Sequence, residues 1–200
     1  MSFARGILYR IIRWPILWIM SLYHWPKFIG RENMPEGGCI ICANHSGLAD
    51  PVWAVLAMKP KTTPWIMAKK SAMEAPVIGK LFAAFGAFGV DRDNPDINAV
   101  KKSLTVLKNG EQLLIFPEGT RVKKGKTVEP KSGAVMLANR TDVPIVPVFI
   151  TRNRKPFRRI RVVIGTPYKA AFESRKPSSE ELQTATDELM RKIYAMESTK

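Results

Sequence analysis

Short apolar runs alternate with segments of helical spacing along this chain, and no other feature limits its fold as strongly. The runs that suit strands lie at residues 37–43, 63–68, 112–116, 144–150 and 160–165. Helical patterns lie at residues 51–58, at residues 94–110 with Asn94 as the expected cap, and at residues 132–138; a capping box of Ser178 and Glu181 begins a last helix. The alternation predicts an α/β domain in which helices flank a mostly parallel central sheet.

The first apolar run leads into a polar loop, Asn44-His45-Ser46-Gly47-Leu48-Ala49-Asp50. Because Pro51 disfavours helical backbone at the residue before it, Asp50 is the expected N-cap of the next helix, with Pro51 at the first helical position. A short loop between strand and helix lets the Asp50 carboxylate fold back onto the His45 imidazole. That contact would fix the tautomer and leave the other ring nitrogen to take a proton from a hydroxyl. The alternative is that Asp50 only caps the helix and His45 is an ordinary loop residue.

A second loop, Phe116-Pro117-Glu118-Gly119-Thr120-Arg121, follows the strand at 112–116. Gly119 allows close backbone approach to a ligand, Thr120 offers a hydroxyl, and Arg121 carries a planar fork that suits phosphate oxygens. Glu118 would repel a phosphate, so its expected role is to orient Arg121 or to accept a hydrogen bond from a substrate hydroxyl. The alternative is a tight turn with an exposed salt bridge. Both loops are expected at the carboxyl ends of parallel strands, where ligands bind in such sheets.

The first 33 residues are expected to form a helical, amphipathic, membrane-associating segment, and residues 34–200 the catalytic domain. Uncharged sequence runs from Trp14 to His24, about half of the roughly 20 residues that a spanning helix needs. Segments that combine apolar residues, tryptophan and arginine lie in the membrane interface. The alternatives are a signal peptide or a helix packed on the core. The residues expected at the interface are Trp14, Trp18, Trp25, Arg10 and Arg13.

The chain is strongly basic, with 32 Lys and Arg against 17 Asp and Glu and a net charge of +15. Such a balance favours anionic partners: lipid head groups, nucleic acid or phosphorylated small molecules. Six of the ten residues from Arg152 to Arg161 are basic. They are expected to hold the protein on anionic lipid, at about 1 kcal/mol for each basic residue near the surface, unless they form an ordinary solvated face. Residues 75–90 are apolar with small residues, contain Phe82, Phe85 and Phe88 and are interrupted by Lys80, a pattern that suits either a core helix or a second lipid-facing surface.

Cys39 and Cys42 lie inside an apolar run without further ligands nearby, so they are expected to be buried small side chains. One histidine and one aspartate do not complete a metal site, and no metal is predicted.

The two loops together resemble the 1-acylglycerol-3-phosphate (lysophosphatidic acid) acyltransferase family of the glycerolipid acyltransferase superfamily. The resemblance rests on Asn44-His45-x-x-x-x-Asp50, followed some seventy residues later by Phe116-Pro117-Glu118-Gly119-Thr120-Arg121. Two weaker blocks agree in order, at residues 86–92 and 143–148, and Lys131 stands where the family often has Lys-x-Gly. The chain departs from the pattern at Gly89, where the family usually has a bulky apolar residue. The resemblance covers about residues 38–150.

The resemblance implies transfer of a fatty acyl group from acyl-CoA or acyl-carrier protein to the 2-hydroxyl of lysophosphatidic acid, which forms phosphatidic acid in phospholipid biosynthesis. His45 would be the base, and Asp50 would stabilise the imidazolium. No bound cofactor is expected. No acyl-enzyme is expected either, because the chain has no G-x-S-x-G elbow and Ser46 has no second base. The residues that would hold the glycerol phosphate are Glu118, Gly119, Thr120, Arg121, Arg92 and Lys131, with Asn44 and Pro117 as supporting motif residues.

The expected partners are anionic membrane lipids, lysophosphatidic acid and acyl-carrier protein, without nucleic acid, at the cytoplasmic face of the cell membrane as a peripheral or monotopic protein. Backbone amides near Gly47 are the suggested donors to the tetrahedral oxyanion. Residues 144–148 would line an acyl groove or form a core strand. Two alternatives remain: an acyltransferase that acts on glycerol 3-phosphate or another lysolipid, and a non-enzymatic basic protein that binds membrane or nucleic acid through charge.

Overall fold

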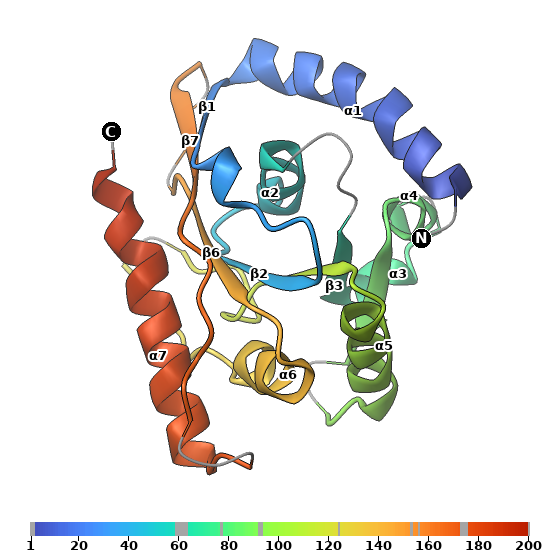
Figure 1. Cartoon of the computed structure of the whole chain (residues 1–200). Helices are drawn as coiled ribbons and strands as arrows, with labels where there is room; N and C mark the ends of the chain where they lie inside the picture. The colour runs from blue at the N-terminus through green and yellow to red at the C-terminus, as the bar shows by residue number, and fades with distance from the viewer. Residues whose placement is uncertain are drawn as a thin grey trace.

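The computed structural model describes residues 3–58, 64–76, 78–91, 94–123, 125–152, 154–155, 157–172 and 176–199. One sheet of seven strands crosses this part of the chain in the order β1-β7-β6-β2-β5-β3-β4 (Figure 1). All neighbouring pairs are parallel except β6 and β7, which are antiparallel. The predicted mostly parallel α/β sheet is therefore confirmed. The strands are β1 (Trp25–Ile29), β2 (Cys39–Ala43), β3 (Trp65–Lys69), β4 (Ala87–Val90), β5 (Gln112–Ile115), β6 (Ile145–Ile150) and β7 (Arg159–Ile164).

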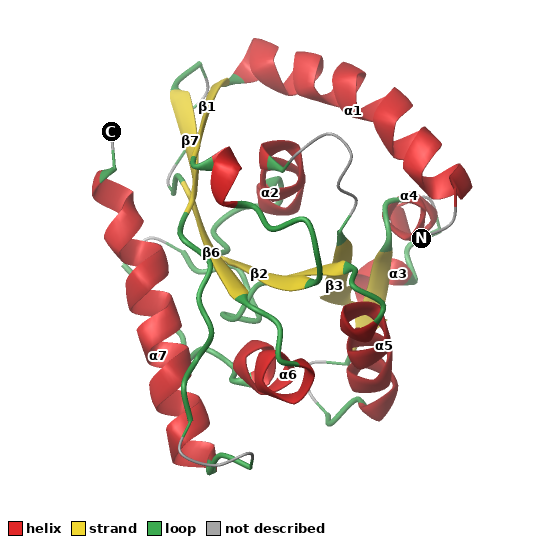
Figure 2. Cartoon of the chain, in the orientation of Figure 1, coloured by secondary structure: helices red, strands yellow, loops and turns green. Residues whose placement is uncertain are grey.

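Helices cover both faces of the sheet (Figure 2). On one face α1 arches over α2, and on the other lie α5, α6 and α7 (Figure 1). Two apolar clusters fill the spaces between these helices and the sheet. β2 and β6 are buried along their whole length, so residues 144–148 belong to a core strand rather than an exposed groove. The helices are α1 (Phe3–Tyr23), α2 (Asp50–Ala57), α3 (Lys70–Met73), α4 (Ile78–Ala84), α5 (Ile97–Lys108), α6 (Gly133–Thr141) and α7 (Ser179–Ala195), with 3-10 turns η1 (Arg31–Asn33) and η2 (Met196–Ser198).

The caps of two helices can be compared with those predicted from the sequence. The predicted capping box at α7 is confirmed, since Ser178 and Glu181 bond each other's backbone amides. The predicted cap at Asn94 is wrong. Asp96 caps α5 instead, because its carboxylate accepts from the Ala99 amide at 2.9 Å and from the Asp91 amide at 3.0 Å.

Two strands were not predicted from the sequence. β1 lies inside the segment that was expected to be helical through residue 33, but it pairs in parallel with β7 at the edge of the sheet. The helical part of that segment ends at Tyr23. β4 lies inside the apolar stretch at 75–90, which is therefore a short helix followed by a strand. The strand predicted at 63–68 is β3, although Thr63 lies outside the described residues.

The helix α1 has two different apolar sides. Ile16, Leu17 and Met20 pack against the core cluster that contains α2. The other side leaves Trp14, 62% exposed, and Trp18, 66% exposed, in solvent. Trp25 in β1 is similarly exposed. Among the described residues, no helix combines the length and the apolar character that crossing a membrane requires.

Arg13 does not lie on the exposed side of α1, so its predicted place at the membrane interface is wrong. Its side chain is buried, and its guanidinium donates to the carbonyl oxygens of Val55, Leu56 and Met58 at 3.1, 2.6 and 2.8 Å. The last carbonyls of a helix lack internal partners, and a cation there also complements the helix dipole. Arg13 thus joins α1 to the end of α2. The side chain of Arg10 lies outside the described residues.

Candidate active site

The loop that carries His45 connects the end of β2 to the start of α2. Asn44, the first residue of this loop, is fully buried. Its side-chain nitrogen donates to the Ile150 carbonyl at 3.0 Å, and its side-chain oxygen accepts from the Ile150 backbone amide at 2.7 Å. Through these two bonds the Asn44 side chain binds the backbone of β6 just beyond the point where the backbone pairing of β2 with β6 ends. The loop therefore leaves the sheet at a defined point, which explains the need for an asparagine there.

The predicted contact between His45 and Asp50 is present. Asp50 Oδ2 lies 3.0 Å from His45 Nδ1 and also accepts from the backbone amides of Ser46 and Gly47, each at 2.6 Å. Asp50 is the first residue of α2, and Ala49 holds the cap position, so the predicted capping role of Asp50 is wrong. Its carboxylate turns back into the loop instead. The amides near Gly47, suggested above as oxyanion donors, are occupied by this carboxylate.

Arg154 completes the environment of Asp50 and was not identified from the sequence. Its Nη1 atom lies 2.5 Å from Asp50 Oδ1, and the two side chains are 12% and 0% exposed. The guanidinium packs directly over Gly47, where any Cβ atom would collide with it. Burial alone would raise the pKa of Asp50. The bond from His45, the Arg154 charge and the two amides outweigh burial and hold that pKa below its usual value. Asp50 is therefore a carboxylate at neutral pH.

Glu118 braces the His45 loop from the other side. It is 5% exposed; its Oε2 atom accepts from the His45 backbone amide at 2.6 Å, and its Oε1 atom accepts from the Tyr194 hydroxyl of α7. The Val122 amide donates to the His45 carbonyl at 2.8 Å, so both backbone groups of His45 are held by the second loop. The donors to Glu118 are the His45 amide and the Tyr194 hydroxyl rather than Arg121. Its predicted role as an acceptor for a substrate hydroxyl stays a prediction. Burial raises the pKa of Glu118, against the effect of the Tyr194 and His45 bonds.

The imidazole itself is held by packing as well as by Asp50. The Phe116 ring lies 4.5 Å from the His45 ring, centroid to centroid, at an interplanar angle of 32°. The side chain is 13% exposed. Within the described residues Nε2 makes no hydrogen bond, so this nitrogen can exchange a proton with a substrate.

The remaining residues of the second loop lie on the segment that Val122 ties to the His45 backbone. Gly119 adopts a φ of 64°, in the region that favours glycine, and the stem of the Lys131 side chain lies against it. The Lys131 amide donates to the carbonyl of the buried Pro117 at 2.8 Å. Thr120 and Arg121 are exposed. Thr120, Arg121 and Lys131 thus present a hydroxyl and two cations on exposed positions of a segment whose backbone bonds to His45 through Val122. Arg92 lies outside the described residues.

Comparison with known proteins identifies the family. The family model described as Acyltransferase matches residues 26–151. The chain belongs to the acyltransferase family. The resemblance noted from the two loops is therefore confirmed, and the acyltransferase is an enzyme rather than a non-enzymatic basic protein.

Individual relatives are consistent with this family. The acyltransferase is 32% identical over 185 residues to the 1-acyl-sn-glycerol-3-phosphate acyltransferase of Bacillus subtilis, covering 90% of this chain and 92% of the relative. It is 32% identical over 147 residues to the enzyme of that name from Cocos nucifera, covering 72% of this chain and 46% of the relative. The solved structure of the 1-acyl-sn-glycerophosphate (LPA) acyltransferase PlsC from Thermotoga maritima superposes with a TM-score of 0.74 at 24% identity, over 98% of this chain and 82% of that one. That structure shares the fold.

Proposed function

We propose that this acyltransferase moves a fatty acyl group from a thioester to the 2-hydroxyl of 1-acylglycerol 3-phosphate and forms phosphatidic acid. The observation that carries the proposal is the 3.0 Å contact between His45 and the buried Asp50, in a loop tied to the cationic second loop. The names of the curated relatives support this acceptor. Acyl-CoA and acyl-carrier protein are both candidate donors.

The mechanism follows from the tautomer that Asp50 enforces. With its Nδ1–H directed to Asp50, His45 has a lone pair on Nε2 that takes the hydroxyl proton as the hydroxyl oxygen attacks the thioester carbonyl carbon. The tetrahedral intermediate then expels the thiolate, which receives the proton from the imidazolium. Asp50 and its amide partners stabilise the imidazolium between these two steps. Arg154 keeps the carboxylate ionised and oriented, so proton exchange occurs at the histidine alone.

The acceptor phosphate is assigned to the second loop. In the acceptor the phosphate and the 2-hydroxyl belong to one glycerol unit, so the phosphate has to bind close to His45. Thr120, Arg121 and Lys131 supply a hydroxyl and two cations in the loop that holds the His45 backbone. Gly119 allows the ligand to approach the backbone of the same loop. These groups suit a phosphate dianion better than a neutral lysolipid.

Purified enzyme is expected to form phosphatidic acid from lysophosphatidic acid with acyl-CoA or with acyl-carrier protein, measured by product analysis. Ser46→Ala should retain more than half of the wild-type kcat, because the transfer is direct and passes through no acyl-serine. Glycerol 3-phosphate and a neutral lysolipid serve as the competing acceptors. A higher kcat/KM with either of them, or loss of turnover in Ser46→Ala, would contradict the proposal.

We also propose that the exposed side of α1 lies in the membrane interface at the cytoplasmic face, where Trp14, Trp18 and Trp25 would meet lipid. Tryptophan is enriched at that depth, and an exposed apolar helix face is costly in water. Burial of about two such rings contributes several kcal/mol, so Trp14→Glu/Trp18→Glu is expected to weaken binding to anionic vesicles by at least about 10-fold. Vesicle sedimentation measures this. Ile97→Glu is the control, since Ile97 is 67% exposed on α5 at the opposite face of the sheet. Equal loss in both variants would refute the assignment.

A further inference from the structure

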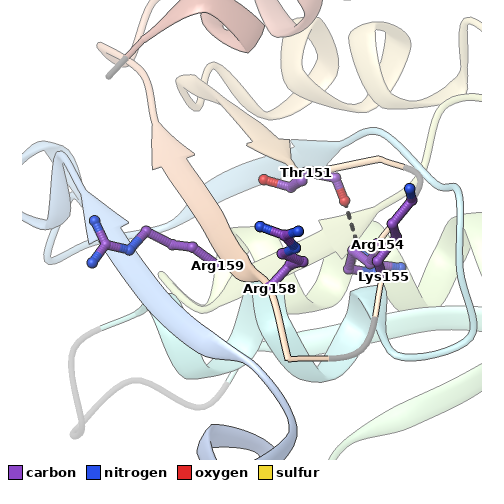
Figure 3. Close-up of a pocket in the computed structure, with 5 residues that line it drawn as sticks. All are labelled: Thr151, Arg154, Lys155, Arg158 and Arg159. Atoms are coloured by element: carbon purple, nitrogen blue, oxygen red, sulfur yellow. Dashed lines mark hydrogen bonds between the residues drawn. The ribbon is translucent and has the colours of Figure 1, made fainter.

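A cationic cavity lies at the connection between β6 and β7, on the Asp50 side of the active site (Figure 3). Its volume is about 290 Å³. The residues that line it are Thr151, Arg154, Lys155, Arg158 and Arg159. The Thr151 carbonyl accepts from Arg154 Nη1 at 3.2 Å, the same nitrogen that contacts Asp50. The cavity and the His45–Asp50 pair thus share one guanidinium.

The basic residues of this connection fall into two groups. Arg152 pairs with the Glu197 carboxylate at 2.7 Å, and Arg161 donates to the Glu197 carbonyl at 3.0 Å, so both are bound to η2. The other group lines the cavity, with the Arg159 side chain extending away from Arg154 and Arg158 (Figure 3). In the described part of the chain, the side chains of Lys155, Arg158 and Arg159 have no carboxylate partner. Like charges held together in this way repel, and a bound anion would relieve that repulsion.

Hydrogen bonds to neighbouring elements hold the connection around the cavity in place. The Phe157 amide donates to the Tyr23 carbonyl at 2.9 Å, and the buried His24 ring nitrogen Nδ1 lies 3.2 Å from the Arg158 carbonyl. Both contacts fix the connection to the end of α1. At the other side the Thr151 hydroxyl accepts from the Arg161 amide at 2.9 Å. A preformed cationic cavity needs little reorganisation when it binds an anion.

The strand order places this cavity opposite the acceptor loop. β2, which carries His45 at its end, lies between β5 and β6. The loop after β5 holds Thr120 and Arg121, and the connection after β6 holds the cavity. His45 therefore stands between two cationic regions. A reaction that joins two phosphate-bearing substrates at one base requires such an arrangement, one region for each substrate.

We propose that the cavity binds the phosphate of the acyl donor's phosphopantetheine arm, an inference that rests on the proposed acyl transfer. Acyl-CoA and acyl-carrier protein share this phosphate, so the assignment covers both donors. In the donor the thioester and the phosphate stand at opposite ends of a long flexible arm. The donor phosphate can therefore bind beyond Asp50, whereas the acceptor phosphate cannot. An anionic lipid head group presents the same chemistry and is the competing source.

The test removes two of the three cavity cations that make no ion pair, as Arg158→Ala/Arg159→Ala in the whole enzyme. Loss of two charge-assisted contacts is expected to raise KM for acyl-CoA by roughly 10-fold or more. KM for lysophosphatidic acid and turnover of an S-acyl-N-acetylcysteamine, a thioester without phosphate, should change less than 2-fold. Arg140→Ala/Arg191→Ala removes the same charge from exposed positions on α6 and α7 and should match the wild type. Arg121→Ala should show the reverse pattern, a raised KM for the acceptor only.

Calorimetric binding of CoA, without turnover, separates this inference from the proposed function. Wild-type binding that weakens in Arg158→Ala/Arg159→Ala but not in Arg140→Ala/Arg191→Ala supports the cavity even if lysophosphatidic acid is not the acceptor. Unchanged CoA binding overturns the inference, as does absence of CoA binding by the wild type. Weaker binding to phosphatidylglycerol vesicles with unchanged CoA binding would assign the cavity to a lipid head group and also overturn it. A raised KM for lysophosphatidic acid with unchanged KM for acyl-CoA would do the same.

Discussion

Replacing His45 by alanine is expected to lower kcat for acyl transfer by about 10²- to 10⁴-fold, the range that a general base supplies. The loss should be confined to catalysis. The backbone amide and carbonyl of His45, rather than its side chain, hold the loop to Glu118 and Val122. Thermal unfolding should therefore change little, and KM for lysophosphatidic acid should stay within about 3-fold.

Asp50→Asn is expected to lower kcat by a factor in the same range. In a double variant it should lower kcat little beyond the effect of His45→Ala, because the two side chains act as one unit. No orientation of the amide suits the site. If its oxygen faces the Ser46 and Gly47 amides, its NH2 group meets Arg154; if it is flipped, its NH2 group meets the amides. Losses that multiply in the double variant would contradict a shared role.

The pH profile of kcat provides an independent check on the same pair. Histidines titrate between about pH 5 and 8, so the rate should fall as the pH decreases through that range. The pKa of Asp50 is held below its usual value, so this carboxylate stays ionised throughout the range. Its contribution to stability is present at neutral pH and is lost only as the pH falls through that depressed pKa. A rate that is flat from pH 5 to 8 would exclude histidine as the base.

Glu118→Ala is expected to have the second-largest effect, on both stability and turnover. The change leaves the His45 amide and the Tyr194 hydroxyl without their acceptor in a buried site. Unsatisfied buried donors of this kind cost about 1–3 kcal/mol each, so the loss of the acceptor for two of them should lower the free energy of unfolding by at least about 2 kcal/mol. Turnover should fall at least about 10-fold, because the loop that positions the imidazole is released on one side. Chemical denaturation and steady-state kinetics measure the two effects.

Glu118→Gln is the matched variant, since it keeps one acceptor oxygen and the side-chain volume. Burial raises the pKa of Glu118, so the folded enzyme holds that proton more tightly than the unfolded chain. The wild type should therefore lose stability relative to Glu118→Gln as the pH rises through that raised value. A positioning role predicts that kcat falls while KM for the acceptor is kept. A raised KM with unchanged kcat would instead make Glu118 a substrate ligand.

The sequence predicts the central sheet well because its inner strands are continuous apolar runs. β2, β5 and β6 are buried on both faces, and such strands show no competing polar pattern. β1 could not be predicted in this way. Trp25–Ile29 contains a proline and a lysine, both tolerated at a sheet edge, and the strand follows directly on an apolar helix. β4 contains a glycine in an apolar run that mixes small residues with phenylalanine, a composition that suits a helix or a strand equally.

The contact between His45 and Asp50 is predictable because these two residues are five positions apart in one loop. The groups that position the pair are not. Arg154 belongs to a cluster in which six of ten residues are basic, and nothing local distinguishes it from its neighbours. Tyr194 lies 76 positions from its partner Glu118, in a helix whose pattern predicts only packing. Long-range partners of this kind require the sheet order, which the spacing of motifs does not reveal.

The bond between α7 and Glu118 also sets an order of events during biosynthesis. A growing chain presents β2 and the His45 loop first, β5 and Glu118 next, and Tyr194 only 76 residues after Glu118. Contacts so distant in sequence close late in folding, because their loop entropy has to be overcome first. The hydrogen bond from Tyr194 to Glu118 is therefore absent from the nascent chain until α7 has been made. A ribosome-bound fragment without α7 is therefore expected to lack this contact and to be less active than the whole enzyme.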